Sequence, residues 1–396
     1  MKTELLHSDV QEFINQSLKI ETAQLAFQKN PFPQIPWNEI LTQIQSKRKA
    51  QEKLPTWFQT SGILYPLSLS IEQTSSEKCA AYKASLLSGD SLIDLTGGLG
   101  IDAFYFSKHF KTVTHCEWQP TLSELVQHNY QALKATNINC ISGDGLQILQ
   151  DLNQQWDCIY IDPARRNQAK EKVFFLKDCE PNVPELLDTY FEYSTKVFIK
   201  TAPLLDLAAG LNELKHVKEI HVVALDNEVK ELLWLLEKGY TGSIQVVAVN
   251  IKNTETDVFK STLDAESSAY SNYSTPKEFL YEPNSALMKT GQFNRIAEQY
   301  ALDKLQLHSQ LYTSASLIDF PGRVFKIVAN YPFNKQTMKT YLQNQKVNIT
   351  IRNFPISVSE LRKKWKIKDG GNQYVFLTTD CNNEKIILIC EKINLL

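Results

Sequence analysis

The sequence lacks the features that mark several large classes of protein. No apolar run approaches the roughly 20 residues that a membrane-spanning helix needs, and the start, Met1-Lys2-Thr3-Glu4, has no signal-peptide pattern. The seven cysteines are odd in number and scattered without a C-x-x-C pair, and the seven histidines have no metal-ligand spacing. We therefore expect a cytoplasmic protein with reduced thiols, no metal site and no membrane partner.

The sequence also has no large excess of positive or negative charge, because the formal net charge of the 396 residues is −2. This value excludes a protein that is basic over its whole surface. The average conceals an asymmetry, since the stretch from Pro321 to Gly370 has eleven Lys and Arg residues and two acidic residues, a net charge of +9. This stretch is a candidate polyanion-binding surface. From charge alone, a solvated helix face remains the alternative.

The most informative stretch is Ser91–Asp102, which reads Ser-Leu-Ile-Asp-Leu-Thr-Gly-Gly-Leu-Gly-Ile-Asp. A short apolar run ends at an acidic residue, three glycines follow, and helical spacing then resumes. This pattern predicts a strand, a tight turn and the start of a helix. Glycines let the backbone turn sharply and lie against a ligand, while the free N–H groups of the first helical turn face the same place. We expect a small-molecule site here, with an ordinary strand-to-helix connection as the alternative.

Apolar runs alternate with helical stretches beyond this turn, which predicts a doubly wound α/β domain with a parallel sheet and ligands at the carboxyl ends of its strands. Seven strands are expected, at 92–95, 113–116, 140–142, 158–161, 196–199, 220–225 and 244–251. The expected domains are an N-terminal helical region at 1–75, this core at 76–262, a short α+β segment at 275–320 and a basic α+β module at 321–396.

Acidic residues end three of the predicted strands. Glu117 ends the second strand, 20 positions after Gly97, where a carboxylate can accept hydrogen bonds from both hydroxyls of a ribose. Asp144 follows the third strand and can accept from an exocyclic amine, and Asp162 ends the fourth. Each acid taken alone could instead be a helix N-cap.

The series Asp-x-Thr-Gly-Gly-x-Gly, Glu, Gly-Asp-Gly and Asp-Pro resembles the motifs of class I S-adenosylmethionine-dependent methyltransferases, which have a Rossmann-like seven-stranded sheet. A nicotinamide dehydrogenase accounts for the first two motifs only. The resemblance implies S-adenosyl-L-methionine as cofactor, with the methionyl part, the ribose and the adenine held by Asp94, Thr96, Gly97, Gly98, Gly100, Glu117 and Asp144.

The fourth motif, Asp162-Pro163-Ala164-Arg165-Arg166, resembles the Asp-Pro-Pro-aromatic motif of amino-methylating enzymes of this class. The resemblance implies Asp162, Pro163 and Arg165 as catalytic residues, with the acid accepting hydrogen bonds from the target amine. Ala164 and Arg165 depart from the motif at the second proline and the aromatic residue. Arg166 and Phe174 are candidate substrate-binding residues that could stack on a base or clamp a phosphate, and the alternative for the arginine pair is a surface salt bridge.

The Asp-Pro-Ala-Arg form also resembles the uridine C5-methyltransferases of RNA. Those enzymes need a nucleophilic cysteine after the fifth strand, where this sequence has Lys200-Thr201-Ala202-Pro203. A covalent route through a thiol is therefore not expected.

Over nearly its whole length the chain also resembles a family of bacterial proteins assigned as methyltransferases, which combine a class I core with a small ferredoxin-like domain and a C-terminal THUMP-like domain. The likeness lies in residues 69–77, the glycine turn, Asp162–Arg166 and Ile351-Arg352-Asn353-Phe354-Pro355. THUMP modules in general bind structured RNA, so the resemblance implies RNA as partner, with Arg352, Lys363 and Lys364 among its contacts.

The leading hypothesis is a methyltransferase that modifies a base in structured RNA, such as tRNA or rRNA. A methyltransferase for a protein or a small molecule, and a non-catalytic protein that binds the cofactor and RNA, are the alternatives. The target atom and the oligomeric state remain open at this point.

Overall fold

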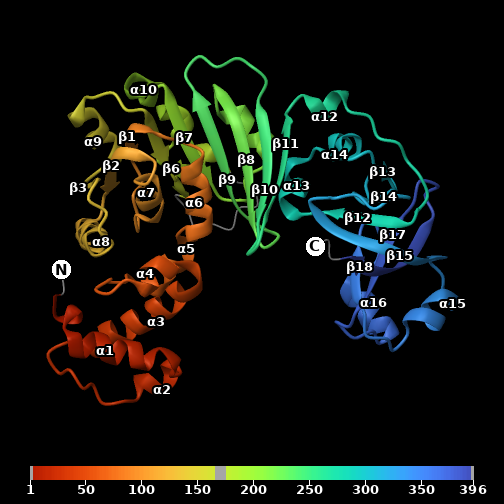
Figure 1. Cartoon of the computed structure of the whole chain (residues 1–396), viewed down its shortest axis with the longest axis horizontal. Coiled ribbons are helices and arrows are strands. Elements are labelled where there is room, and N and C mark those ends of the chain that lie inside the picture. The colour runs from red at the N-terminus through yellow and green to blue at the C-terminus, as the bar shows by residue number, and fades with distance from the viewer. Residues whose placement is uncertain (1–2, 166–174, 394–396) are drawn as a thin grey trace. The chain divides into compact units, whose positions relative to one another are not determined.

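The computed structural model describes residues 3–165 and 175–393, which group into two compact units (Figure 1). The first unit holds Met1–Lys218 and Glu231–Thr241, and the second holds Glu219–Lys230 and Gly242–Leu396. The division falls within the predicted core at 76–262, because residues 219–230 belong to the second unit.

The first unit begins with the predicted helical region. Its helices are η1 (Thr3–Leu6), α1 (Ser8–Gln16), η2 (Ser17–Lys19), α2 (Thr22–Ala26), α3 (Trp37–Lys53), α4 (Pro55–Gln59) and α5 (Ser68–Gln73). Apolar side chains at helical spacing, among them Val10 and Ile14 of α1 and Ile40 and Ile44 of α3, are buried together in one cluster.

A twisted sheet forms the centre of the first unit, with strands in the order β9-β7-β4-β1-β2-β3. All of these strands pair in parallel except β9, which is antiparallel to β7. The strands are β1 (Gly89–Asp94), β2 (Phe110–Glu117), β3 (Ile138–Ser142), β4 (Cys158–Ile161), β7 (Lys196–Thr201) and β9 (Glu228–Glu237). All four residues of β4 are buried, as expected for a central strand of a sheet with covered faces.

Helices connect the strands. They are α7 (Ile101–Phe106), α8 (Pro120–Ala132), α9 (Gly145–Leu152), α10 (Val183–Tyr193) and α11 (Leu207–Glu213), and short η3 (Leu176–Asp178), β5 (Ala164–Arg165) and β6 (Cys179–Glu180) lie after β4. Helix α6 (Glu77–Ser85) precedes β1, and its start is capped by the hydroxyl of Ser76, which accepts a hydrogen bond from the N–H of Cys79 at 3.3 Å.

The second unit contains most of β8 (Val217–Leu225), which pairs in parallel with β10 (Gln245–Ile251), and the antiparallel hairpin of β10 with β11 (Thr256–Thr262). It also contains a seven-stranded sheet in the order β13-β14-β12-β15-β18-β17-β16. These strands are β12 (Phe279–Pro283), β13 (Asp303–Lys304), β14 (Tyr312–Ser314), β15 (Gly322–Pro332), β16 (Asn348–Ile351), β17 (Gln373–Thr379) and β18 (Lys385–Ile393).

The helices of the second unit are α12 (Ala265–Ser268), α13 (Ser285–Thr290), α14 (Phe293–Gln299), α15 (Lys335–Thr337), the short π-helix η4 (Met338–Leu342) and α16 (Val358–Trp365). Helix α16 starts with a capping box between Ser357 and Glu360. Buried Met338, Leu361 and Trp365 belong to one cluster with Val375 of β17, so η4 and α16 pack on the sheet together.

All seven predicted strands are present, and β9 and β11 are additional. Strand β9 was not predicted because its apolar run, Leu232–Leu236, continues without polar alternation and is compatible with a buried helix. Residues 285–299 form two helices rather than one, because Gly291 adopts a positive φ of 73° between α13 and α14.

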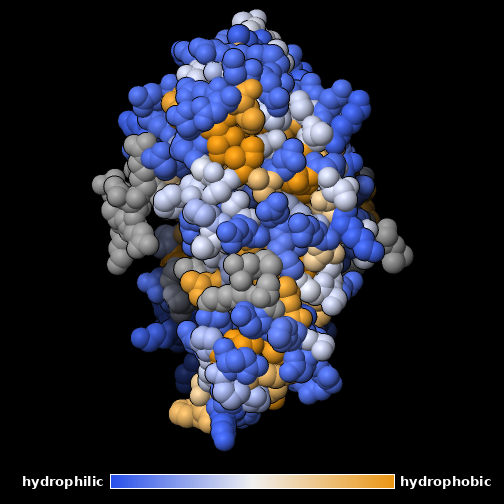
Figure 2. Space-filling view, turned by 90° about the vertical axis from the view of Figure 1, so that its left-hand side faces the viewer, coloured by the Kyte–Doolittle hydropathy of each residue, from blue (hydrophilic) through white to orange (hydrophobic). Residues whose placement is uncertain are grey.

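No helix within residues 3–165 and 175–393 is long and apolar enough to cross a membrane. Figure 2 shows one face that is mostly hydrophilic, with hydrophobic residues gathered in small separate areas. All seven cysteines lie within the described residues and none forms a disulfide, and five of them are buried.

Candidate functional site

A cleft of about 590 Å³ lies in the first unit at the carboxyl ends of β1, β2, β3 and β4. Its walls are Leu95, Thr96, Cys116, Glu117, Trp118, Gly143, Asp144, Gly145, Leu146, Asp162, Ala164, Glu180, Pro181, Leu186 and Tyr190. The cleft therefore brings together the loops that follow four successive predicted strands, as expected for ligand sites in open α/β sheets.

The charged residues that the structure describes in the walls of this cleft are all acidic. Four of its lining residues are acidic, namely Glu117, Asp144, Asp162 and Glu180, and none of the lining residues that the structure describes is Lys or Arg. Such walls favour a ligand that carries positive charge, and the structure describes no cation among them that could pair with a phosphate.

The glycine turn brings the backbone close to its neighbours. Gly100 caps α7 with a φ of 70°, and a Cβ there would lie 2.0 Å from the hydroxyl oxygen of Tyr130, which donates to the Gly100 carbonyl at 2.8 Å. A Cβ on Gly97 would lie 2.6 Å from the carbonyl oxygen of Cys116. The packing therefore needs glycine at both positions, and at Gly100 the positive φ favours glycine as well.

Glu117 lies at the end of β2 with both carboxylate oxygens held by backbone. Its Oε2 accepts from the N–H of Gly98 and its Oε1 from the N–H of Gln119, each at 2.8 Å. Burial raises the pKa of Glu117, and the two N–H donors oppose that shift. Each oxygen keeps a further lone pair, so the carboxylate can still accept two hydroxyl groups of a ligand.

Asp144 has two roles at the end of β3. Its Oδ1 accepts from the N–H of Gln147 at 2.9 Å and so caps α9, and the residue also lines the cleft. The N-cap alternative raised by the sequence is thus present in the structure, and the adenine contact stays a prediction.

Asp94 lies beneath the turn and is 2% exposed. Its Oδ1 accepts from the backbone N–H of Thr96 at 3.0 Å and from the Thr96 hydroxyl at 3.3 Å. Burial raises the pKa of Asp94 to about 8. This side chain therefore shapes the turn from below, while Thr96 lines the cleft.

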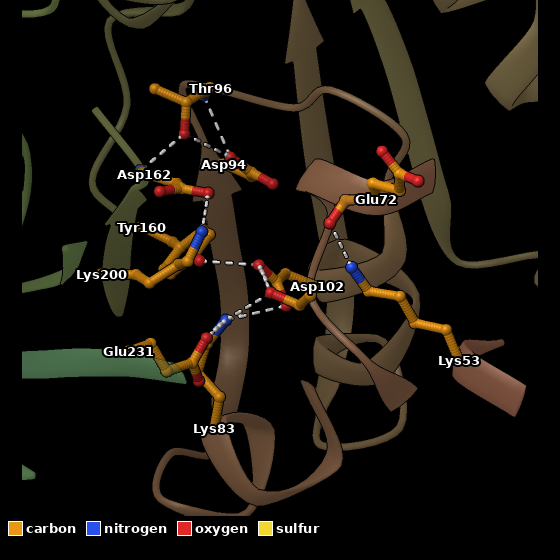
Figure 3. Close-up of polar contacts among 11 residues, drawn as sticks. Lys53, Glu72, Lys83, Asp94, Thr96, Asp102, Tyr160, Asp162, Lys200 and Glu231 are labelled. Atoms are coloured by element: carbon orange, nitrogen blue, oxygen red, sulfur yellow. Dashed lines mark hydrogen bonds and ion pairs between the residues drawn. The ribbon is translucent and has the colours of Figure 1, made fainter. Parts of the chain in front are cut away.

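Asp162 follows β4 and is held from two sides (Figure 3). Its backbone N–H donates to the Thr96 hydroxyl at 2.7 Å, and its Oδ2 forms an ion pair with Nζ of Lys200 at the end of β7, at 2.5 Å. Burial lowers the pKa of Lys200, but the facing carboxylates, Asp162 first, raise it above its usual value. Among residues 3–165 and 175–393, no hydrogen-bond donor contacts Oδ1 of Asp162.

A buried cluster of charged and polar side chains lies next to this pair (Figure 3). Nζ of Lys83, whose side chain is 0% exposed, is 2.9 Å from Oδ1 of Asp102 and 3.2 Å from Oε2 of Glu231. The hydroxyl of Tyr160 donates to Oδ2 of Asp102 at 2.8 Å. Burial lowers the pKa of Lys83, yet the two carboxylates outweigh it and raise the pKa above its ordinary value.

The structure describes only some of the other residues predicted for the fourth motif. Pro163 is buried, and the backbone of Arg165 pairs with Cys179 in the two-stranded β5–β6 ribbon. The Arg165 side chain, Arg166 and Phe174 lie outside the described residues, and their roles stay predictions.

The residues predicted to contact RNA lie in the second unit, and they differ in whether the structure pairs them with an acid. Arg352 donates to Oε1 of the buried Glu282 at 3.0 Å, and Arg323 pairs with the same carboxylate. Lys363 and Lys364 are exposed on α16. Arg352 thus joins two strands of its own sheet, and the two lysines face solvent.

Several residues of the site were not singled out from the sequence, among them Trp118 and Lys200. Trp118 directly follows Glu117, lines the cleft and is 72% exposed, and only the structure shows this exposure. Lys200 follows the apolar run Val197–Ile199, and only the fold shows that its partner is Asp162.

Comparison with known proteins supports this reading of the fold. The ferredoxin-like domain pattern matches residues 279–321, and the THUMP domain-like pattern matches residues 322–392. The crystal structure of a putative methyltransferase from Porphyromonas gingivalis W83 is 30% identical, covers 99% of both chains and has a TM-score of 0.88. The chain belongs to this methyltransferase family.

Other similarities are confined to part of the chain. An rRNA methylase from Streptococcus thermophilus is 14% identical over 41% of this chain and 95% of that one, with a TM-score of 0.30. TrmK from M. capricolum, solved with S-adenosyl-homocysteine, is 12% identical over 48% of this chain and 73% of that one, with a TM-score of 0.33. These two scores carry no argument about function. No curated protein matches the sequence.

Proposed function

We propose that this member of the family is an S-adenosylmethionine-dependent methyltransferase that acts on RNA. The observation that carries the cofactor assignment is the cleft around Glu117 at the end of β2, whose described lining residues include four acids and no Lys or Arg. A dinucleotide would place phosphates against those carboxylates, whereas a sulfonium places a positive charge there.

The donor set of the cleft fits an adenosyl ligand. Glu117 can accept both ribose hydroxyls, because each of its oxygens is oriented by one backbone N–H and keeps a lone pair. Asp144 is placed to accept from the adenine amine, and the exposed ring of Trp118 next to Glu117 offers a flat apolar surface to the base. The turn residues Leu95 and Thr96 would bound the methionyl part.

When bound, S-adenosylmethionine supplies a methyl group from a sulfonium and is left as a neutral thioether. The contribution of the chain is to hold the acceptor in line and to exclude water. Oδ1 of Asp162 can accept a hydrogen bond from the acceptor and fix its position, since Oδ2 is taken by Lys200 and the backbone N–H by Thr96.

RNA is supported by a surface of the second unit that has unbalanced positive charge. Seven lysines there are exposed and have no ion-pair partner among the described residues. We call this the lysine surface, and its members are Lys335, Lys339, Lys346, Lys363, Lys364, Lys366 and Lys368. The nearby acids are already occupied, Glu360 by the cap of α16 and Asp369 by Arg362. Lysines that lack counter-charges favour a polyanion.

The lysine surface is built on packed helices. The backbone N–H of Asn344, after η4, donates to the carbonyl of Trp365 at the end of α16 at 3.0 Å, and Lys346 and Lys368 form an isolated bridge. The two segments that carry these lysines therefore contact each other, and their helices η4 and α16 share one apolar cluster with the sheet.

Methyl transfer to RNA from a strain that lacks the gene tests the function directly. We expect the purified full chain to move labelled methyl groups from S-adenosylmethionine into that RNA, and nucleoside mass spectrometry then identifies the product. RNA from the parent strain, which is already methylated, is the matched control. Transfer to protein and none to RNA would contradict the proposal.

A further inference from the structure

The ion pair between Asp162 and Lys200 lies where the acidic cleft meets the buried cluster of Lys83, Asp102 and Glu231 (Figure 3). Asp162 lines the cleft, and the Lys200 side chain, 15% exposed, lies behind it. Together these groups comprise two ammonium groups and three carboxyl groups.

We propose that Lys200 is a positioning residue that compensates the charge of Asp162, so that the cleft does not hold the sulfonium cofactor much more tightly than its neutral product. The inference rests on the proposed use of S-adenosylmethionine, and no comparison assigns a role to Lys200.

The described walls of the cleft already carry negative charge, because Glu117 and Asp144 line it and favour a cation. A further carboxylate without compensation would strengthen the binding of the sulfonium. Binding that favours the charged ground state over a transition state in which the charge leaves sulfur slows transfer. A cation beside Asp162 limits this effect while keeping the carboxylate available as an acceptor.

Lys200 also restrains the orientation of the Asp162 carboxylate. The ion pair of Lys200 with Oδ2 restrains the Asp162 carboxylate, and the Thr96 hydroxyl holds the backbone N–H of the same residue. Among the described residues Oδ1 has no donor, so it is the oxygen open to the acceptor. A neutral side chain of similar length would leave the carboxylate in place but free to turn.

The test compares the two ligands by calorimetry on the full chain. S-adenosylmethionine carries the positive charge and S-adenosylhomocysteine does not, so the ratio of their affinities reports the field in the cleft. In Lys200→Met we expect this ratio to rise about tenfold in favour of S-adenosylmethionine, because Asp162 is then uncompensated. In Asp162→Asn we expect the ratio to move the opposite way.

Further variants separate charge from folding. The double variant Asp162→Asn/Lys200→Met should return the ratio to within about threefold of the wild-type value, and Lys200→Arg should stay near it, because the charges balance again. Lys111→Met is the matched control, since it removes the cation of an exposed ion pair with Asp90 at the opposite end of β1. It should leave the ratio unchanged.

The outcomes are distinguishable. If the wild-type protein binds neither ligand, the proposed cofactor is wrong and the inference falls with it. If the wild-type protein binds both ligands and the ratio stays constant in Lys200→Met and in Asp162→Asn, only the inference is overturned. If Lys200→Met binds neither ligand, the affinity ratio of Asp162→Asn decides: a shift toward S-adenosylhomocysteine supports the inference, and an unchanged ratio or a shift toward S-adenosylmethionine overturns it.

Discussion

The hydroxyl of Thr96 accepts a hydrogen bond from the backbone N–H of Asp162 at 2.7 Å. This contact joins the turn after β1 to the loop after β4, across 66 residues of sequence. The two motifs that the resemblance assigns to cofactor and acceptor are thus connected through one side chain. Several of the predictions below depend on such contacts between neighbouring strand ends.

Replacement of Thr96 by Val should loosen that connection. Valine has nearly the same shape but leaves the N–H of Asp162 without its acceptor, which we expect to lower the free energy of unfolding by about 1–2 kcal/mol. Urea denaturation measures the change. Thr96→Ser keeps the hydroxyl and should lose less than half as much, and equal losses in the two variants would show that the hydrogen bond contributes little.

Gly100→Ala should be more destabilising than an alanine at another glycine of similar φ. Gly62 has a φ of 78° and nothing within 4 Å of an added Cβ, whereas a Cβ on Gly100 meets the Tyr130 hydroxyl at 2.0 Å. Both variants bear the backbone strain, and Gly100→Ala alone adds a clash of about 1–3 kcal/mol. Thermal unfolding of the two variants side by side measures this difference, and matching melting temperatures would contradict the packing of the turn.

Asp94 should make the protein less stable as the pH rises. In the unfolded chain its carboxyl loses its proton near pH 4, whereas in the folded protein burial raises the pKa to about 8. Between these values the unfolded state binds fewer protons, so this contribution to stability is complete below about pH 4 and is lost toward pH 8. The slope has an upper limit of about 1.4 kcal/mol per pH unit.

Asp94→Asn isolates this contribution, because asparagine cannot titrate and can still accept from Thr96. The unfolding free energy of the wild-type protein minus that of the variant should fall steadily from pH 5 to pH 8. A difference that is flat over this range would mean that Asp94 is ionised in the folded protein.

The lysine surface should control the salt dependence of RNA binding. Replacing two of its members, in Lys363→Glu/Lys366→Glu, should weaken binding and reduce the slope of log affinity against log salt by about 1–2, since each phosphate contact contributes roughly 0.7–0.9. Filter binding of bulk RNA at several salt concentrations measures the slope. The double variant Lys19→Glu/Lys29→Glu changes the charge equally on exposed residues of the first unit and should leave the slope as it is.

Local patterns in the sequence were sufficient for much of the site. The apolar runs and the acids that end them placed Glu117, Asp144 and Asp162 at neighbouring strand ends, because parallel strands put their carboxyl ends at one edge. The structure confirms that these acids line one cleft. Their individual roles stay predictions.

Ion pairs between residues far apart in the sequence could not be predicted from such local patterns. Lys83 has the helical spacing of the buried Cys79, Ala80 and Ala84, so its burial was readable, but Glu231 is far away in sequence and on a strand that the pattern did not predict. The same holds for Lys200, whose partner Asp162 is 38 residues away. Strand order, rather than local preference, brings these charges together.

Calorimetry of S-adenosylhomocysteine with the full chain tests the central claim most directly, that the strand ends around Glu117 form a cofactor site. We expect binding in the micromolar range that Glu117→Ala weakens at least about tenfold, through the loss of two charge-assisted hydrogen bonds to the ribose. Asp90→Ala, at the far end of β1, should leave the affinity unchanged. No binding by the wild-type protein, or binding that Glu117→Ala leaves unaltered, would contradict the account.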